Sequence, residues 1–221
     1  MPRTPAPESR LTAAPKTKPT PATSGPARPV FARHAASLIV LRGKSEVLMG
    51  MRGAGHRFMP NRLVFPGGSV DPGDGARPAA TEPRPDVLAA LGRAARPRLA
   101  RALVAAAVRE LEEETGLSLG DPSRLDGIGY LCRAVTPPAS PMRFNARFLM
   151  VDAAQATGTI GGSGELEGLR YYPMDEALAL DLALVTREVL LRLQAWQALG
   201  ATGQAARMAT DVFKQRRWWT E

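Results

Sequence analysis

The chain has 221 residues, 44% of them hydrophobic, and its 29 basic and 21 acidic side chains give a net charge of +8. This length suits one domain of ordinary size with additional segments, and the charge favours an anionic partner, although an arginine-rich amino-acid usage explains it equally well. The single cysteine, Cys132, excludes an intramolecular disulfide and a cysteine-based zinc site, so we expect a reducing, cytoplasmic compartment. No apolar run reaches the length of a membrane-spanning helix, and we expect no membrane partner.

Composition divides the chain into three parts. Residues 1–29 are rich in proline, alanine and basic residues and contain little apolar surface, which predicts a disordered tail. The folded domain is expected over residues 30–200. Residues 201–221 end in FKQRRWWTE and are interpreted as a basic, aromatic C-terminal tail.

The first part of the domain is predicted to be β-structure. Residues 36–42 and 46–52 are apolar or alternating, and the intervening GKS turn predicts a hairpin. The GKS sequence is not a phosphate-binding P-loop, because it lacks the earlier glycine and precedes a strand. Residues 62–68, RLVFPGG, predict a strand that stops at Pro66 and the two glycines.

A poorly patterned loop and two helices are expected next. Residues 86–94 predict a short helix with Asp86 as its N-cap and Pro97 as its terminator. Residues 98–116 are rich in alanine, leucine, arginine and glutamate, and they predict a strong helix that ends at Gly116.

The remaining elements mix strands and helices. Strands are predicted over residues 127–137, 143–153 and 169–174, and helices over residues 175–180 and 185–199. Strands on both sides of a central helix predict an α/β or α+β domain.

The stretch RELEEETGL places four glutamates at the C-terminal end of the central helix. At helical spacing Glu110, Glu113 and Glu114 share one face. Arg109 borders that face, and Glu112 points the opposite way. Like charges at this spacing repel by roughly 0.2–0.5 kcal/mol per pair, and the helix dipole adds about 0.3–1 kcal/mol per carboxylate. A hard divalent cation reverses both effects, whereas a solvated acidic face is the alternative interpretation.

This stretch resembles the second half of a Nudix box, whose pattern is G-x5-E-x7-R-E-U-x-E-E-x-G-U with U a bulky apolar residue. The matching residues are Arg109, Glu110, Leu111, Glu113, Glu114, Gly116 and Leu117. The first half matches in part: with Gly68 as the box glycine, Asp74 stands where the pattern has glutamate. Arg109 follows Asp74 by 35 positions instead of 8, which indicates an insertion of 27 residues (35 − 8) within about 75–101. A box split at this place, together with RFMPNRLVFPGG at 57–68, is similar to a Nudix branch that includes a peroxisomal coenzyme A diphosphatase.

The resemblance implies the Nudix fold, a mixed β-sheet sandwiched between helices. It also implies hydrolysis of a nucleoside diphosphate derivative that depends on Mg²⁺ or Mn²⁺. It assigns metal binding to three carboxylates and one backbone carbonyl, those of Glu110, Glu113, Glu114 and Gly68. It further implies that Arg109 pairs with Asp74 and holds the box together. Because relatives of this kind are often dimers, a homodimer is one expectation.

The candidate catalytic residues are Glu113 and Arg109. Water must lose a proton as it attacks phosphorus, and Glu113 is the first candidate for the base because it is central among the expected ligands. Glu165 and Glu167 are the alternatives. Arg52, Arg57 and Arg143 are candidates for binding the substrate phosphates, because a guanidinium offers a bidentate fork. His34, at the entrance to the domain, is interpreted as a surface or substrate-edge residue.

Three functions remain open at this level. The first is a diphosphohydrolase, acting on coenzyme A or its acyl derivatives, ADP-ribose, NADH or a nucleotide sugar. The second is a catalytically idle Nudix domain that senses a nucleotide. The third, nucleic-acid binding through the basic ends, is not favoured, because the body of the sequence lacks an interleaved aromatic and basic strand.

Overall fold

The computed structural model describes residues 30–55 and 58–221. The predicted tail at 1–29 and the candidate Arg57 therefore lie outside the described residues. The larger strands are β1 (Arg33–Arg42), β2 (Glu46–Arg52), β8 (Gly129–Val135), β9 (Phe144–Asp152) and β11 (Leu166–Pro173). The short strands are β3 (Leu63–Val64), β4 (Gly67–Ser69), β5 (Ala79–Thr81), β6 (Leu117–Ser118), β7 (Ser123–Arg124), β10 (Thr157–Gly158), β12 (Asp211–Lys214) and β13 (Arg217–Thr220). The α-helices are α1 (Pro85–Gly92), α2 (Pro97–Thr115), α3 (Met174–Ala179), α4 (Leu184–Ala198) and α5 (Gly200–Ala206).

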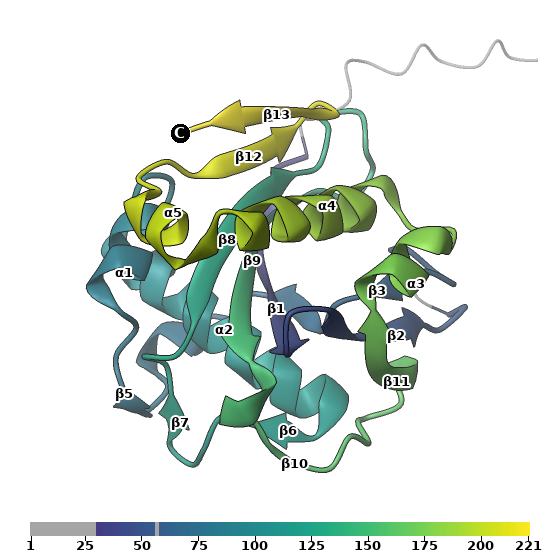
Figure 1. Cartoon of the computed structure of the whole chain (residues 1–221), viewed down its shortest axis with the longest axis horizontal. Coiled ribbons are helices and arrows are strands. Elements are labelled where there is room, and N and C mark those ends of the chain that lie inside the picture. The colour runs from purple at the N-terminus through teal and green to yellow at the C-terminus, as the bar shows by residue number, and fades with distance from the viewer. Residues whose placement is uncertain (1–29, 56–57) are drawn as a thin grey trace, which may run out of the picture.

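Within the described residues, nine strands form the main sheet. Its order is β11-β2-β1-β9-β8-β12-β13, with β3 paired to β2 and β4 paired to β1. The β1–β9 and β8–β12 pairs are parallel and the others are antiparallel, so the sheet is mixed. Figure 1 shows α2 and α4 on opposite sides of β8 and β9, which confirms the predicted sheet between helices.

The apolar runs of the central strands reflect burial on both faces of the sheet. In β1, Leu38 and Val40 pack against the α2 side, while Ile39 packs against the α4 side. In β9, Leu149 joins the first cluster and Phe148 the second. Successive strand residues point to opposite faces, so a strand that is covered on both faces carries apolar residues without alternation.

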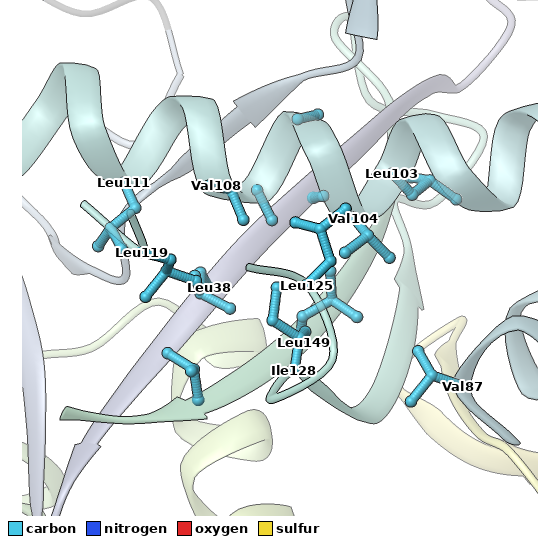
Figure 2. Close-up of a cluster of buried hydrophobic side chains, with 14 of the residues drawn as sticks. Leu38, Val87, Leu103, Val104, Val108, Leu111, Leu119, Leu125, Ile128 and Leu149 are labelled. Atoms are coloured by element: carbon cyan, nitrogen blue, oxygen red, sulfur yellow. The ribbon is translucent and has the colours of Figure 1, made fainter. Parts of the chain in front are cut away.

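The extent predicted for the central helix is confirmed, since α2 spans Pro97–Thr115. Leu103, Val104, Val108 and Leu111 project from α2 onto the sheet, as Figure 2 shows. The helix ends where Gly116 adopts a left-handed conformation with φ of 73°, and its amide donates to the Glu112 carbonyl at 2.9 Å. Glycine takes this conformation without a steric penalty, so the box glycine fixes where the helix ends.

Three local expectations are wrong. The single strand predicted over residues 62–68 is two strands: β3 ends at Val64, before Pro66, and the two glycines do not stop a strand but begin β4, which pairs with β1. The N-cap of α1 is Arg84 rather than Asp86, and Pro97 is the first residue of α2 rather than only a terminator. In both helices a proline occupies the first turn, where its missing N–H has no intrahelical role.

The C-terminal segment is not a tail. Strand β12 pairs in parallel with β8, and β13 completes a hairpin at the edge of the main sheet (Figure 1). Val212 and Phe213 are buried. The pairing partner, β8, lies about 80 residues earlier (211 − 132 = 79 at the first paired positions), so local sequence pattern does not reveal it. None of the helices in the described part of the chain is long and apolar enough to cross a lipid bilayer.

Candidate active site

A cavity of about 730 Å³ opens beside β4 and the last turns of α2. The polar part of its wall next to the box includes Arg52, Gly67, Gly68, Ser69, Glu110, Glu113 and Glu165. These residues come from β2, β4, α2 and the loop before β11. The structure therefore brings the glycine and glutamate halves of the box together across the insertion.

Arg109 organises this wall. Its Nε and Nη2 atoms donate to the two carboxylate oxygens of Asp74 at 2.9 and 3.2 Å, and Nη2 also donates to the Ser69 carbonyl at 3.0 Å. Its Nη1 donates to Glu110 at 2.8 Å and to Glu113 at 2.9 Å. The hydrogen bond to Asp74 is the main cause that raises the pKa of Arg109. The contact between Arg109 and Asp74 is the one that the resemblance implied, and aspartate replaces glutamate without losing it.

Two glycines allow β4 to pass very close to its neighbours. A Cβ atom on Gly68 would lie 2.2 Å from Oε1 of Glu110. A Cβ atom on Gly67 would lie 2.5 Å from the carbonyl oxygen of Ala36, because β4 pairs directly with β1. Any side chain at Gly68 would therefore displace the Glu110 carboxylate, and any at Gly67 would disturb the sheet.

Glu114 is the most deeply buried acid of the box, with 1% of its surface exposed. Its Oε2 accepts a hydrogen bond from the Gly67 amide at 2.7 Å. Its Oε1 lies 3.6 Å from the Arg52 guanidinium and has no hydrogen-bond partner among the described residues. Burial raises the pKa of Glu114 to about 8, and the carboxylates of Glu110 and Glu165 add to the rise against the opposing effects of Gly67 and Arg52.

The other glutamates of the box differ in exposure. Burial also raises the pKa of Glu110, and the neighbouring Arg109 opposes that rise. The side chain of Glu113 is 55% exposed and lines the cavity. Glu112 is exposed and does not line the cavity, as its position on the helix predicts.

The donor set fits a hard divalent cation. Among residues 30–55 and 58–221, no three acidic, histidine or cysteine side chains converge closely enough to hold an ion as they stand. The carboxylates do not converge because those of Glu110 and Glu113 both contact the same nitrogen of Arg109. The Oε1 atom of Glu114 is nevertheless buried without a hydrogen bond in the described structure, with the Arg52 guanidinium 3.6 Å away, so it keeps the capacity to bind an ion. Carboxylate and carbonyl oxygens are the ligands that Mg²⁺ and Mn²⁺ prefer.

The two candidate phosphate-binding arginines in the described residues have different positions. Arg52 lines the cavity, lies 3.8 Å from Glu165, and has a buried Nε without a hydrogen-bond partner in the described structure. Arg143 does not line the cavity, and its guanidinium donates to the carbonyls of Thr136 and Val30, which ties two chain segments together. Glu165 also faces the cavity, whereas Glu167 is exposed on β11 and does not.

Sequence reasoning missed most of the apolar wall. This part of the cavity is lined mainly by Phe58, Met59, Val64, Phe65, Phe144, Phe148, Val185 and Phe213. Phe58 and Phe144 make an edge contact with ring centroids 4.8 Å apart. The alternation along β9 could have indicated that Phe144 and Phe148 share one face, but Phe213 comes from the segment interpreted as a tail.

Comparisons with known proteins agree with this geometry. Residues 100–193, which include the second half of the box, match the NUDIX domain family. Among solved structures, a NUDIX hydrolase from Alicyclobacillus acidocaldarius shares 26% identity, with 75% of this chain and 92% of that chain covered and a TM-score of 0.59. A MutT protein from Methanosarcina mazei Go1 shares 15% identity, with 78% and 99% covered and a TM-score of 0.52. A search of curated proteins finds no match.

The mixed sheet, the split box and these matches identify the fold as the Nudix fold. The NUDIX domain match and the similarity to the NUDIX hydrolase from Alicyclobacillus acidocaldarius support a Nudix diphosphohydrolase.

Proposed function

We propose that the protein hydrolyses the diphosphate linkage of a nucleoside diphosphate derivative with the help of Mg²⁺ or Mn²⁺. Glu110, Glu113, Glu114 and the Gly68 carbonyl would hold the ion. The observation that carries the proposal is Glu114, a buried carboxylate with one unpartnered oxygen beside the cavity that contains the other candidate ligands. An oxygen that is buried without a hydrogen bond is costly, and a divalent cation would complete a site that Gly67 and Arg52 satisfy only in part.

The residues of the wall have separate roles in this reaction. A bound divalent ion neutralises phosphate charge and lowers the pKa of water. Glu113 is placed to accept the proton of the attacking water, since its carboxylate is exposed at the cavity and Arg109 holds it. Glu165, which also faces the cavity, is the alternative base. Arg52 orients a substrate phosphate, because its guanidinium lies between Glu114 and Glu165 at the cavity wall.

The apolar wall suggests the kind of group that is linked to the nucleoside diphosphate. Five phenylalanines and a methionine line the cavity, those at positions 58, 65, 144, 148, 213 and 59. Such a surface favours an apolar or extended group over a sugar, because a buried sugar needs many hydrogen bonds. We therefore place coenzyme A and acyl-coenzyme A ahead of nucleotide sugars as substrates.

A panel of diphosphates tests the proposal. The full chain is incubated with Mg²⁺ or Mn²⁺ and each of coenzyme A, an acyl-coenzyme A, ADP-ribose, NADH and a nucleotide sugar, and the products are identified by mass. We expect metal-dependent release of a nucleoside monophosphate-type product, and none in EDTA. A protein that binds one of these compounds without cleaving it would instead be an idle sensor domain.

The two adjacent exposed glutamates of α2 provide a matched pair of variants. Glu113→Gln is expected to lower kcat by about 10²-fold or more, the contribution typical of a general base. Glu112→Gln removes the same charge one position away and should leave kcat within about twofold, since Glu112 makes no side-chain contact with the cavity. Equal rates in the two variants would contradict the assignment of Glu113 and direct attention to Glu165.

A further inference from the structure

A second hollow lies on the other face of the sheet from the cavity described above. It is lined by His34, Arg93, Arg96, Leu99 and the intervening residues of the α1–α2 connection. In β1, Ala35 and Ser37 line the catalytic cavity, whereas His34 precedes them and points to the opposite face. The connection belongs to the insertion that splits the box, so the insertion builds this hollow.

A pair of buried arginines lies beside the hollow. Arg133 of β8 and Arg147 of β9 are directly opposite each other in the sheet, with 9% and 0% of their surfaces exposed. Like charges at opposed positions destabilise a sheet, and buried cations require a counter-charge. Arg133 pairs with Glu221 but retains an Nε without a partner in the described structure. The salt bridges of the described residues include none to Arg147, whose Nη1 donates instead to the Asn145 carbonyl at 2.8 Å.

Arg147 contacts the wall of the hollow. Its Nη2 donates to the Ala94 carbonyl at 2.9 Å, and its Nη1 lies 3.2 Å from Nδ1 of His34. A guanidinium only donates hydrogen bonds, so Nδ1 of His34 accepts and Nε2 carries the proton. Burial, with Arg147 and Arg133 nearby, lowers the pKa of His34, which keeps the ring in this neutral form. The ring thus retains an N–H donor beside the cationic floor.

The rim adds further positive potential. Helix α2 begins at the hollow with no side-chain cap and no acidic residue in its first turn, and its N-cap is Arg96. The positive end of this 19-residue helix and its free amides attract anions. Arg93 is also exposed at the rim and donates to the backbone carbonyls of Met208 and Glu221. The C-terminal end of α1 opposes this field, but the Ala94 carbonyl there is already engaged by Arg147.

We propose that this hollow binds a phosphoryl anion at a site separate from the catalytic cavity. Arg96, the first-turn amides of α2 and His34 contact the anion, and buried Arg147 supplies charge from below. A doubly charged phosphoryl group, either free phosphate or the phosphate of a nucleoside monophosphate, matches this cluster better than a monovalent anion, because a phosphate oxygen forms the strongest hydrogen bonds with cationic donors.

Calorimetric titration of the metal-free full chain with inorganic phosphate tests the proposal, at constant ionic strength and with EDTA present. Arg96→Ser should weaken phosphate binding by roughly tenfold or more, which is the loss of one charge-assisted hydrogen bond. Arg98→Ser is the matched control, because Arg98 is exposed two residues later but faces Gly75 rather than the hollow. It should leave the affinity within about twofold, since only screened surface charge is lost.

Parallel titrations with adenosine monophosphate identify the source of the phosphoryl group. Tighter binding that is also lost in Arg96→Ser indicates a nucleotide ligand, and equal or weaker binding indicates phosphate itself. Absence of phosphate binding by the unmodified chain, or equal weakening by Arg96→Ser and Arg98→Ser, would overturn the proposal. Hydrolysis of the diphosphate panel by Arg96→Ser is a separate readout and should be unchanged, so failure of this site does not bear on the proposed catalytic function.

Discussion

Replacement of Arg109 by methionine is expected to destabilise the protein as well as impair hydrolysis. The guanidinium is 8% exposed and makes two hydrogen bonds to Asp74, which is 1% exposed. Without Arg109, Asp74 keeps the hydrogen bond from the Asp71 amide at 2.7 Å and otherwise becomes a buried charge without a cation. The bond to Glu113 contributes little to stability, since that side chain is largely exposed.

The expected magnitude follows from this burial. Removal of one partner of a buried ion pair costs about 3–5 kcal/mol, because the other charge is left uncompensated. Asp74→Asn alone should cost less, about 1–3 kcal/mol, since the neutral amide is cheaper to bury. In Asp74→Asn/Arg109→Met the uncompensated charge is gone, so the double variant should be more stable than the sum of the two single changes predicts, by about 1 kcal/mol or more.

Urea unfolding in EDTA, followed by circular dichroism, measures the four free energies of this cycle. Arg98→Met, an exposed arginine on the same helix, is the control and should change the free energy of unfolding by no more than about 0.5 kcal/mol. A loss below about 1 kcal/mol in Arg109→Met, or additivity of the two changes within about 0.5 kcal/mol, would refute the view that Arg109 and Asp74 stabilise the box as a buried pair.

Three further predictions concern Glu114, the β4 glycines and Cys132. Because the pKa of Glu114 is raised to about 8, the folded metal-free protein holds a proton that the unfolded chain releases. The stabilisation from this bound proton is complete below the usual pKa of a glutamate and is lost as the pH rises to about 8. The temperature of thermal unfolding in EDTA should therefore fall as the pH rises across this range, and it should fall less in Glu114→Gln. Gly68→Ala should reduce hydrolysis with a small loss of stability, since only the flexible end of Glu110 must move, whereas Gly67→Ala meets backbone atoms of β1 and should lower the unfolding temperature markedly. Burial raises the pKa of the Cys132 thiol, so a thiol reagent at pH 8 should modify it only in urea; rapid reaction of the folded protein would contradict its burial.

Local sequence patterns were sufficient for the central helix and the first hairpin. Strands β1 and β2 and the turn at Gly43 agree with prediction because the hairpin depends on neighbouring residues. The observed extent of helix α2 agrees with prediction because an alanine-rich interior favours a helix locally and Gly116 ends the helix through contacts within one or two turns. The box resemblance added the contact between Arg109 and Asp74, since a motif records which side chains meet even when an insertion separates them.

Helical spacing did not determine how the three glutamates of the box differ. Glu110, Glu113 and Glu114 lie on one side of α2, but β4 and Arg52 pack over Glu114 while Glu113 faces solvent. Spacing gives the direction of a side chain from its own helix, and burial depends on which strand lies opposite. The perturbed pKa of Glu114 is therefore a property of the tertiary structure.

The sequence by itself determined the family resemblance, the helix that carries the acids, and the chemistry that oxygen ligands allow. Only the tertiary structure decided that β12 extends the sheet and brings Phe213 to the cavity, and that Arg143 ties two segments together. It also placed Arg133 opposite Arg147. These features depend on contacts between residues far apart in the chain, and each such contact is selected by the burial of whole faces of the sheet rather than by any local pattern.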